Sequence, residues 1–167
     1  MPPRPRKKKI AIPAEFRRRM QTEHGGTFGD RMVLIGNFYS YGPRAAIAKK
    51  YGLMEDDLTI LSSLCDWGDK TATVIAALAS RPRNSISRAV IRLTALGFIQ
   101  SRLDNTDRRK ALLTVTPAGR ELHDQALQPY QEREEWMFSV LTEDEREALD
   151  VILLKLLSRL SEEFVDE

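Results

Sequence analysis

The sequence has few of the residues that form covalent cross-links, metal sites or catalytic centres. Among its 167 residues the only cysteine is Cys65, so an internal disulfide is impossible. The two histidines, His24 and His123, lie far apart, and no Cys/His cluster has metal-ligand spacing. We find no Ser/His/Asp or Cys/His set and no Gly-rich phosphate loop. We therefore expect no catalytic residues, no metal, no cofactor and no enzymatic activity.

Long apolar runs are also missing. No run approaches about 18 apolar residues, the minimum for a membrane-spanning helix, and the segment after Met1 lacks the apolar core of a signal peptide. We expect a soluble, cytoplasmic protein with no membrane partner, long enough to bury a substantial core.

The charge is distributed unevenly along the chain. Residues 1–20 contain eight Lys and Arg against Glu15 alone, and the other 147 residues contain 18 basic and 23 acidic side chains. Four prolines within the first 13 residues oppose a continuous helix. We expect residues 1–24 to form a basic, disordered arm. It is either a solubilising tail or a segment that contacts DNA phosphates or the minor groove.

Helical patterns dominate the next part of the chain. A helix is expected from about Asp30 to Tyr51, with Gly42-Pro43 kinking or splitting it. Glu55-Asp56-Asp57 has the acidic composition of a helix N-terminus, and this second helix ends near Asp66–Asp69. Cys65 falls on its apolar face, which favours a buried thiol over a redox-sensing one.

Two further helices are joined by a short connector. The first spans Thr71–Ala79, and the second runs from about Ser85 to Leu96 with Asn84 as its expected cap. The second helix is amphipathic: its apolar arc comprises Ile86, Ala89, Val90, Leu93 and Leu96, and its polar side Asn84, Ser85, Arg88 and Arg92. This pattern predicts a helix-turn-helix whose second helix enters a DNA major groove. The alternative is an ordinary solvated helix surface.

A short hairpin follows the amphipathic helix. Gly97 favours a helix end, and Phe98–Leu103 and Ala111–Thr116 are β-prone segments on either side of a turn-forming stretch. The expected tip carries Arg108, Arg109 and Lys110. A hairpin appended to a helix-turn-helix is a winged helix, whose wing contacts phosphates or the minor groove.

Residues Gly52 to Gly119 resemble the MarR (multiple antibiotic resistance regulator) family of winged-helix transcription factors. The resemblance is carried by Gly52-Leu53 with Ile60-Leu61-Ser62-Ser63-Leu64, by Ser87-Arg88 with Arg92-Leu93 and Gly97-Phe98-Ile99, and by Asp107-Arg108-Arg109 with Val115-Thr116-Pro117-Ala118-Gly119. It implies that Asp107 holds Arg109 by a salt bridge and that Arg109 enters the minor groove. Candidate DNA contacts are therefore Asn84, Ser85, Ser87, Arg88 and Arg92 on the helix, and Asp107, Arg108, Arg109 and Lys110 on the wing.

Some positions depart from the family pattern. Ser80 stands where a glycine commonly makes the turn between the two helices, and Ile91 stands on the otherwise polar recognition face. Ile91 would contact either a neighbouring loop, which we favour, or a thymine methyl group. The Gly42-Pro43 pair and the basic arm also lie outside the usual outline.

The C-terminal part is expected to be helical. A long helix follows Pro117, and Thr142-Glu143-Asp144-Glu145 has the form of a capping box at the start of a last helix. A broad apolar stripe on that helix needs a partner; it comprises Leu149, Ile152, Leu153, Leu156, Leu157, Leu160 and Phe164. The resemblance implies a homodimer held by the N- and C-terminal helices, although packing within one subunit is the alternative.

The expected organisation is a mainly α fold with a small β-hairpin: arm 1–24, N-terminal dimerisation region 25–52, winged-helix lobe 53–118 and C-terminal dimerisation helices 119–167. The resemblance implies a small aromatic or amphiphilic effector, for which Phe38, Tyr39, Tyr41 and Arg44 are candidate ligand contacts; core packing is the alternative for the aromatics.

We predict a DNA-binding regulator, a repressor released from a palindromic operator by an aromatic acid-like ligand. The alternative is an architectural or protein-interaction winged helix without a ligand switch.

Overall fold

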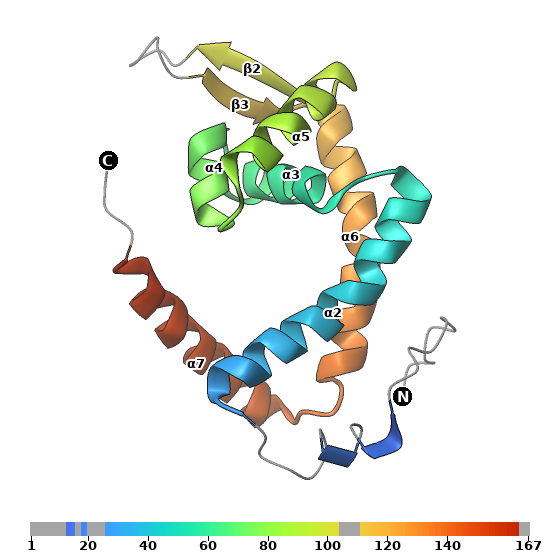
Figure 1. Ribbon diagram of the computed structural model, residues 1–167, viewed down its shortest axis with the longest axis vertical. Coiled ribbons are helices and arrows are strands. Elements are labelled where there is room, and N and C mark those ends of the chain that lie inside the picture. The colour runs from blue at the N-terminus through green and yellow to red at the C-terminus, as the bar shows by residue number, and fades with distance from the viewer. Residues whose placement is uncertain (1–12, 16–17, 20–25, 104–110, 164–167) are drawn as a thin grey trace.

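The computed structural model describes residues 13–15, 18–19, 26–103 and 111–163 of the chain. Within these ranges the major secondary structure consists of six helices and a three-stranded antiparallel sheet (Figure 1). This confirms the predicted mainly α fold with a small β-hairpin. In the same residues, no helix combines the length and apolarity needed to cross a membrane.

Helix α2 (Phe28–Tyr51) is continuous over 24 residues. At its start, the Thr27 hydroxyl accepts a hydrogen bond from the Asp30 N–H, and the Asp30 carboxylate accepts one from the Thr27 N–H at 2.7 Å. Of the two outcomes expected at Gly42-Pro43, a kink or a split, the split does not occur. Pro43 is buried inside the helix, and packing of α2 against α6 offsets the backbone hydrogen bond that proline cannot donate.

The winged-helix lobe is confirmed. It comprises α3 (Glu55–Trp67), β1 (Lys70–Thr71), α4 (Ala72–Leu78), α5 (Arg83–Ala95), β2 (Ile99–Leu103) and β3 (Ala111–Val115). The strands lie in the order β1-β3-β2, and Ile99 pairs with Val115 at one end of the hairpin and Leu103 with Ala111 at the other. The sequence did not predict β1, because two residues are too short to show a strand period.

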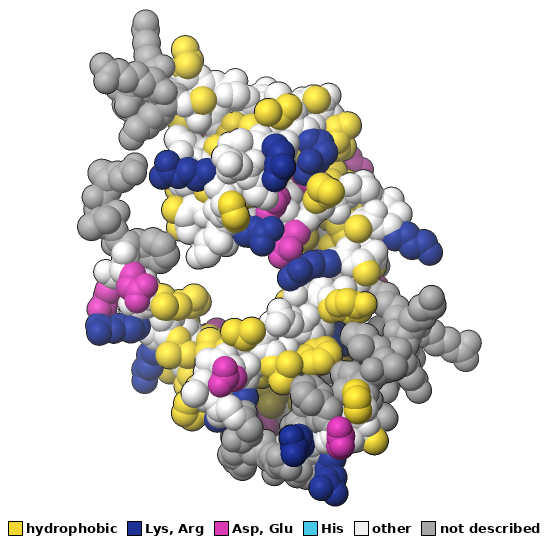
Figure 2. Space-filling view, viewed as in Figure 1, with side chains coloured by type: hydrophobic (Ala, Val, Ile, Leu, Met, Phe, Trp, Pro, Cys, Tyr) yellow, Lys and Arg dark blue, Asp and Glu magenta, His cyan; other side chains and the backbone are white. Residues whose placement is uncertain are grey.

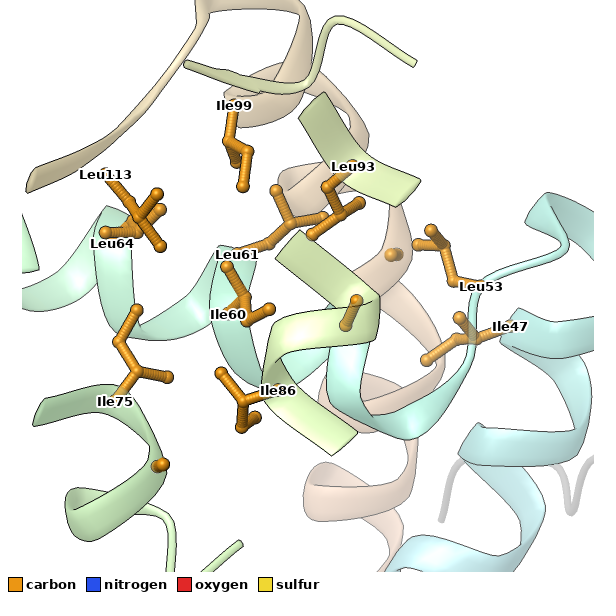
Figure 3. Close-up of a cluster of buried hydrophobic side chains, with 13 residues drawn as sticks. Ile47, Leu53, Ile60, Leu61, Leu64, Ile75, Ile86, Leu93, Ile99 and Leu113 are labelled. Atoms are coloured by element: carbon orange, nitrogen blue, oxygen red, sulfur yellow. The ribbon is translucent and has the colours of Figure 1, made fainter. Parts of the chain in front are cut away.

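One hydrophobic core holds the lobe together (Figure 3). The middle of α3 supplies Ile60, Leu61 and Leu64, all at most 2% exposed. Ile86 and Leu93 of α5 are fully buried against them, as the predicted apolar arc requires, whereas Leu96 at the end of that arc is exposed. Helix α3 contacts α4, α5 and the sheet, so it sets the positions of these elements within the lobe.

Two C-terminal helices complete the chain. α6 (Pro117–Phe138) packs against α2 and α3, whereas α7 (Glu143–Ser161) stands apart from the lobe (Figure 1). The capping box predicted for α7 is confirmed, because the Thr142 hydroxyl accepts from the Glu145 N–H and the Glu145 carboxylate accepts from the Thr142 N–H. No residue of α7 is buried, so its apolar stripe remains largely exposed among the residues that the structure describes.

Candidate functional site

Helix α5 presents one face to the core and another to solvent. It begins at Arg83, slightly before the predicted start, so Asn84 is its second residue and not its cap. Pro82 takes the capping position instead, and its carbonyl accepts hydrogen bonds from the N–H groups of Ser85 and Ile86.

The solvent-facing side of α5 combines polar and cationic side chains. Asn84, Ser87 and Arg88 are exposed, and none of the three side chains forms a hydrogen bond or ion pair with another described residue. Figure 2 shows Lys and Arg side chains gathered over the α4–α5 part of the lobe. This surface has donors free for phosphates and base edges.

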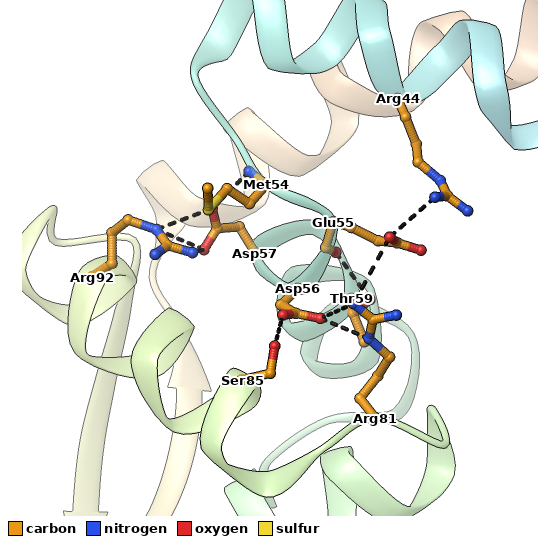
Figure 4. Close-up of polar contacts among 9 residues, drawn as sticks. All are labelled: Arg44, Met54, Glu55, Asp56, Asp57, Thr59, Arg81, Ser85 and Arg92. Atoms are coloured by element: carbon orange, nitrogen blue, oxygen red, sulfur yellow. Dashed lines mark hydrogen bonds and ion pairs between the residues drawn. The ribbon is translucent and has the colours of Figure 1, made fainter.

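Two predicted contact residues have intramolecular partners. The Ser85 hydroxyl donates to the Asp56 carboxylate, and Arg92 donates through Nε to both Asp57 oxygens at 3.1 Å (Figure 4). Asp57 is 1% exposed and also accepts from the Met54 N–H at 2.8 Å, which ties this ion pair to the start of α3. Ser85 and Arg92 thus fix α5 against α3, on the flank of the exposed face.

Asp56 completes this link at the start of α5. Its Oδ1 accepts from Arg81 Nε at 2.7 Å, and Arg81 lies in the connector that leads into the helix. Partial burial would raise the pKa of Asp56, but hydrogen bonds from Ser85 and Arg81 and the charges of Arg81 and Arg92 outweigh it and lower the pKa. The positions of these aspartates in the sequence indicate only the start of a helix, because their partners are 25 or more residues away in sequence.

The turn between α4 and α5 explains one departure from the family pattern. Ser80 has φ = 50°, the only positive φ among described residues other than glycine. The Ser80 N–H donates to the Ala77 carbonyl and the Arg81 N–H to the Ala76 carbonyl, which closes the turn. The left-handed conformation that a glycine would adopt freely is thus imposed on a serine.

An ion pair anchors β2 of the wing near its tip-side end. Arg102 Nη2 on β2 lies 2.7 Å from Asp69 Oδ2, in the connection between α3 and β1. The predicted tip residues, Asp107, Arg108, Arg109 and Lys110, lie outside the described residues.

The Thr116-x-x-Gly119 part of the resemblance has a clear structural basis. Thr116 caps α6 by accepting from the Gly119 N–H at 3.1 Å, and its hydroxyl also lies 2.8 Å from the Gly97 carbonyl oxygen. A Cβ at position 119 would lie 2.0 Å from the Phe98 carbonyl oxygen. Only glycine therefore lets α6 begin this close to the end of α5 and the start of β2.

A cavity of about 790 Å³ lies between α2, α3 and α6. Of the four predicted ligand contacts, Tyr39 and Arg44 line it, whereas Phe38 and Tyr41 are not among the lining residues and Tyr41 is 61% exposed. Helical spacing explains the difference, because residues one or two positions apart point in different directions. Other elements contribute lining residues that the sequence pattern does not predict, among them Met54, Glu55, Leu58, Trp67 and Tyr130.

Some polar side chains that line this cavity form hydrogen bonds with one another. Arg44 Nη1 donates to Glu55 Oε2 at 3.1 Å, and the Tyr39 hydroxyl donates to Glu134 at 3.4 Å. Burial, followed by the negative charge of Glu134, raises the pKa of Tyr39. Asp66 adds a further carboxylate to the lining.

An ion-pair chain links the cavity to α5. Glu55 Oε2, which accepts from Arg44, also lies 3.8 Å from Arg81 Nη2, and Arg81 contacts Asp56, the partner of Ser85 (Figure 4). A change at Arg44 is thus four contacts away from Ser85 in the first turn of α5.

Cys65 is half-buried on α3, and burial raises the pKa of its thiol. A raised pKa leaves less thiolate at neutral pH, which agrees with the interpretation of Cys65 as a packing residue. Among the described residues, no group of three or more His, Cys, Asp or Glu side chains is placed to hold a metal ion.

Comparison with known proteins identifies the fold. No family model matches the chain. The curated regulator BilQ of Clostridium symbiosum, a helix-turn-helix (HTH)-type transcriptional regulator, is 32% identical over 82 residues, which are 49% of this chain and 57% of that protein. The chain thus matches little more than half the length of this relative.

Solved structures cover more of the chain. Apo MarR from E. coli superposes with a TM-score of 0.67 at 19% identity, over 79% of this chain and 98% of that one. BpsR of Bordetella bronchiseptica gives 0.65 at 22% identity, over 80% and 95% of the two chains. A MarR-family regulator from Silicibacter pomeroyi gives 0.65 at 24% identity, over 80% and 90%. The predicted resemblance is confirmed at the level of structure: this chain has the winged-helix fold of the MarR family.

Proposed function

We propose that this protein is a sequence-specific DNA-binding transcriptional regulator. The observation that carries the proposal is the free face of α5, where Asn84, Ser87 and Arg88 are exposed on the second helix of a helix-turn-helix. An arginine there has the geometry to donate two hydrogen bonds to guanine O6 and N7, and the other side chains suit base edges or phosphates. Ser85 and Arg92, held by Asp56 and Asp57, position the helix.

The wing contributes the second DNA contact in this proposal. Its strands are anchored at Arg102 and Asp69, and the tip sequence Asp107-Arg108-Arg109 matches the family pattern. We assign Arg109 to the minor groove, with Asp107 as its salt-bridge partner. The narrow minor groove has an enhanced negative potential that attracts an inserted arginine.

A homodimer provides the required symmetry. The uncovered stripe on α7 is the surface we assign to the partner, through Leu149, Ile152, Leu153, Leu156 and Leu160, with Phe164 outside the described residues. A two-fold dimer would bind a palindromic operator with half-sites about 34–36 Å apart.

The cavity is the proposed effector site. BpsR is described as a protein whose DNA binding is regulated by 6-hydroxynicotinic acid. We propose that a small aromatic acid binds in the cavity of this protein, with its carboxylate on Arg44 and its ring beside Tyr39 and Tyr130. Such a ligand would displace Glu55 from Arg44. Glu55 would then compete with Asp56 for the guanidinium of Arg81. A shift of Arg81 would in turn loosen the hydrogen bond between Asp56 and Ser85. The ligand would thereby shift the population away from the DNA-binding state, as in a repressor.

The DNA-binding proposal is tested by fluorescence anisotropy. Labelled DNA from upstream of the protein's own gene is titrated at fixed salt, against a scrambled duplex of equal length. We expect tighter binding to the upstream DNA, and for Arg88→Ala a loss of discrimination worth about 1–3 kcal/mol. Lys155→Ala, an exposed cation on α7, is the control and should leave discrimination unchanged. Equal affinity of the wild type for both duplexes would instead support the architectural alternative.

The effector proposal is tested on the same complex with two probes. We expect 6-hydroxynicotinic acid to weaken DNA binding by the wild type and to have no effect on Arg44→Gln. Benzyltrimethylammonium is the charge-reversed probe, because Glu55, Asp66 and Glu134 make the lining rich in carboxylates. Release of DNA by the cation alone would overturn the aromatic-acid assignment and leave DNA binding intact.

A further inference from the structure

Ile91 is the one large apolar side chain on the exposed face of α5. It is 70% exposed, so the neighbouring loop that the sequence analysis favoured as its contact does not cover it. Ile86 and Leu93 of the same helix are fully buried, which shows that the core is already filled without Ile91. A single exposed isoleucine is common on protein surfaces; the position of this one on the helix makes it informative.

Ile91 lies at the centre of the face assigned to DNA. Arg88 precedes it by three residues and Ser87 by four, so all three share one side of the helix, and Thr94 and Ala95 extend that side by one turn. Asn84 lies seven residues earlier, or about 10.5 Å along the axis, which corresponds to about three base-pair steps of 3.4 Å. A groove that receives Asn84 and Arg88 therefore also receives Ile91.

We propose that Ile91 is a specificity-determining residue that contacts the C5-methyl group of a thymine in the major groove. This inference rests on the proposed DNA-binding function. Isoleucine has no hydrogen-bonding group, and the thymine methyl is the apolar group that the major-groove code offers. Over a G·C pair the same side chain would cover donors or acceptors without satisfying them, which opposes binding.

The side chain and its position sharpen the assignment. A β-branched residue in a helix keeps one dominant χ1 rotamer, so the Ile91 methyl groups are held in one place. Arg88 lies about 4.5 Å away along the helix axis, between one and two base-pair steps. We therefore expect the recognised thymine within one or two base pairs of the base pair that Arg88 contacts.

The experiment removes the methyl group from the DNA and its partner from the protein. Anisotropy titrations at fixed salt compare the operator with the same duplex carrying deoxyuridine for thymine, using wild type, Ile91→Ala and Leu96→Ala. Leu96 is a matched control, because it is exposed at the end of the same helix but lies about 140° around the axis from Ile91. Thermal unfolding of each variant checks that the fold is retained.

We expect the wild type to lose about fourfold in affinity per contacted thymine, since a buried methyl-sized group contributes about 0.8 kcal/mol and 1.4 kcal/mol is a factor of ten. A two-fold operator with one such contact in each half would lose about fifteenfold. Ile91→Ala should bind both duplexes equally, whereas Leu96→Ala should keep the wild-type preference. Single deoxyuridine substitutions then locate the thymine.

Two results would overturn the inference and leave the proposed function standing. One is a wild type that binds both duplexes equally while it still prefers the operator over scrambled DNA. The other is an Ile91→Ala variant that keeps the full thymine preference, which would assign the methyl contact to another residue. Failure of the wild type to prefer the operator over scrambled DNA would instead remove both the proposed function and this inference.

Discussion

Helix α5 of the winged-helix lobe and helix α7 both carry a series of apolar side chains, but these side chains are buried in α5 and exposed in α7. In α5 the apolar positions Ile86, Ala89 and Leu93 are fully buried, whereas in α7 seven large apolar side chains are at least 40% exposed. Both helices carry apolar side chains that need a partner, but among the described residues only α5 buries most of its apolar arc, against α3, α4 and β2. The comparison teaches that the lobe carries its own core, whereas the apolar side chains of α7 stay exposed among the described residues and are the surface proposed for the dimer.

The largest expected effect comes from charging the apolar stripe of α7. Leu156→Asp should convert the proposed dimer into monomers, because a carboxylate would have to be buried without a partner at the interface. Sedimentation velocity measures the change, and Ser158→Asp, on the opposite side of α7, should remain dimeric. If Leu156→Asp keeps the wild-type sedimentation coefficient and concentration dependence, the stripe is not the dimer interface.

The lobe should respond to a single added methyl group. Gly119→Ala should lower the free energy of unfolding by about 3 kcal/mol, because the new Cβ would lie 2.0 Å from the Phe98 backbone oxygen. Gly36→Ala is the matched control on α2, where no atom lies within 4 Å of the added Cβ. We expect it to be neutral or stabilising by up to about 1 kcal/mol. Urea denaturation measures both variants, and equal midpoints would contradict the close approach at Gly119.

The buried carboxylate behind α5 should contribute somewhat less. Asp57→Asn removes the charge that pairs with Arg92 while keeping the side-chain shape, and we expect a loss of about 2 kcal/mol in unfolding free energy. Glu147→Gln, an exposed residue of α7, should change stability by less than about 0.5 kcal/mol. If Asp57→Asn loses no more stability than the control, the ion pair between Asp57 and Arg92 does not contribute to the unfolding free energy.

The smallest effect concerns the turn at Ser80. Ser80→Gly should stabilise the lobe by about 0.5–1 kcal/mol, because glycine adopts φ = 50° without the steric cost that serine incurs. Ser80→Ala should not stabilise, since alanine keeps the Cβ. Differential scanning calorimetry of the two variants compares them directly, and a higher midpoint for the alanine variant would contradict the role of backbone strain.

Local sequence patterns predicted the elements well and the contacts between them poorly. The caps at Thr142 and the acidic start of α3 depend on residues three or four positions apart, and both are present in the structure. The paired state of Ser85 and Arg92 depends on where α3 crosses α5, which no local pattern records. The same reason explains why Tyr130 of α6 was not predicted beside Tyr39 and Arg44 of α2, although all three line the cavity.

The sequence by itself determined the helix-turn-helix, the two long strands of the wing, the capping of α7 and the apolar stripe that needs a partner. These features follow from periodicity and from short-range hydrogen bonding, which adjacent residues specify. Only the tertiary structure decided that Asp56 and Asp57 hold α5, that Gly119 must lack a side chain, and that Ile91 is left exposed at the centre of the face assigned to DNA. Each of these depends on the distance between segments far apart in the chain, which is set by the packing of the whole lobe around α3.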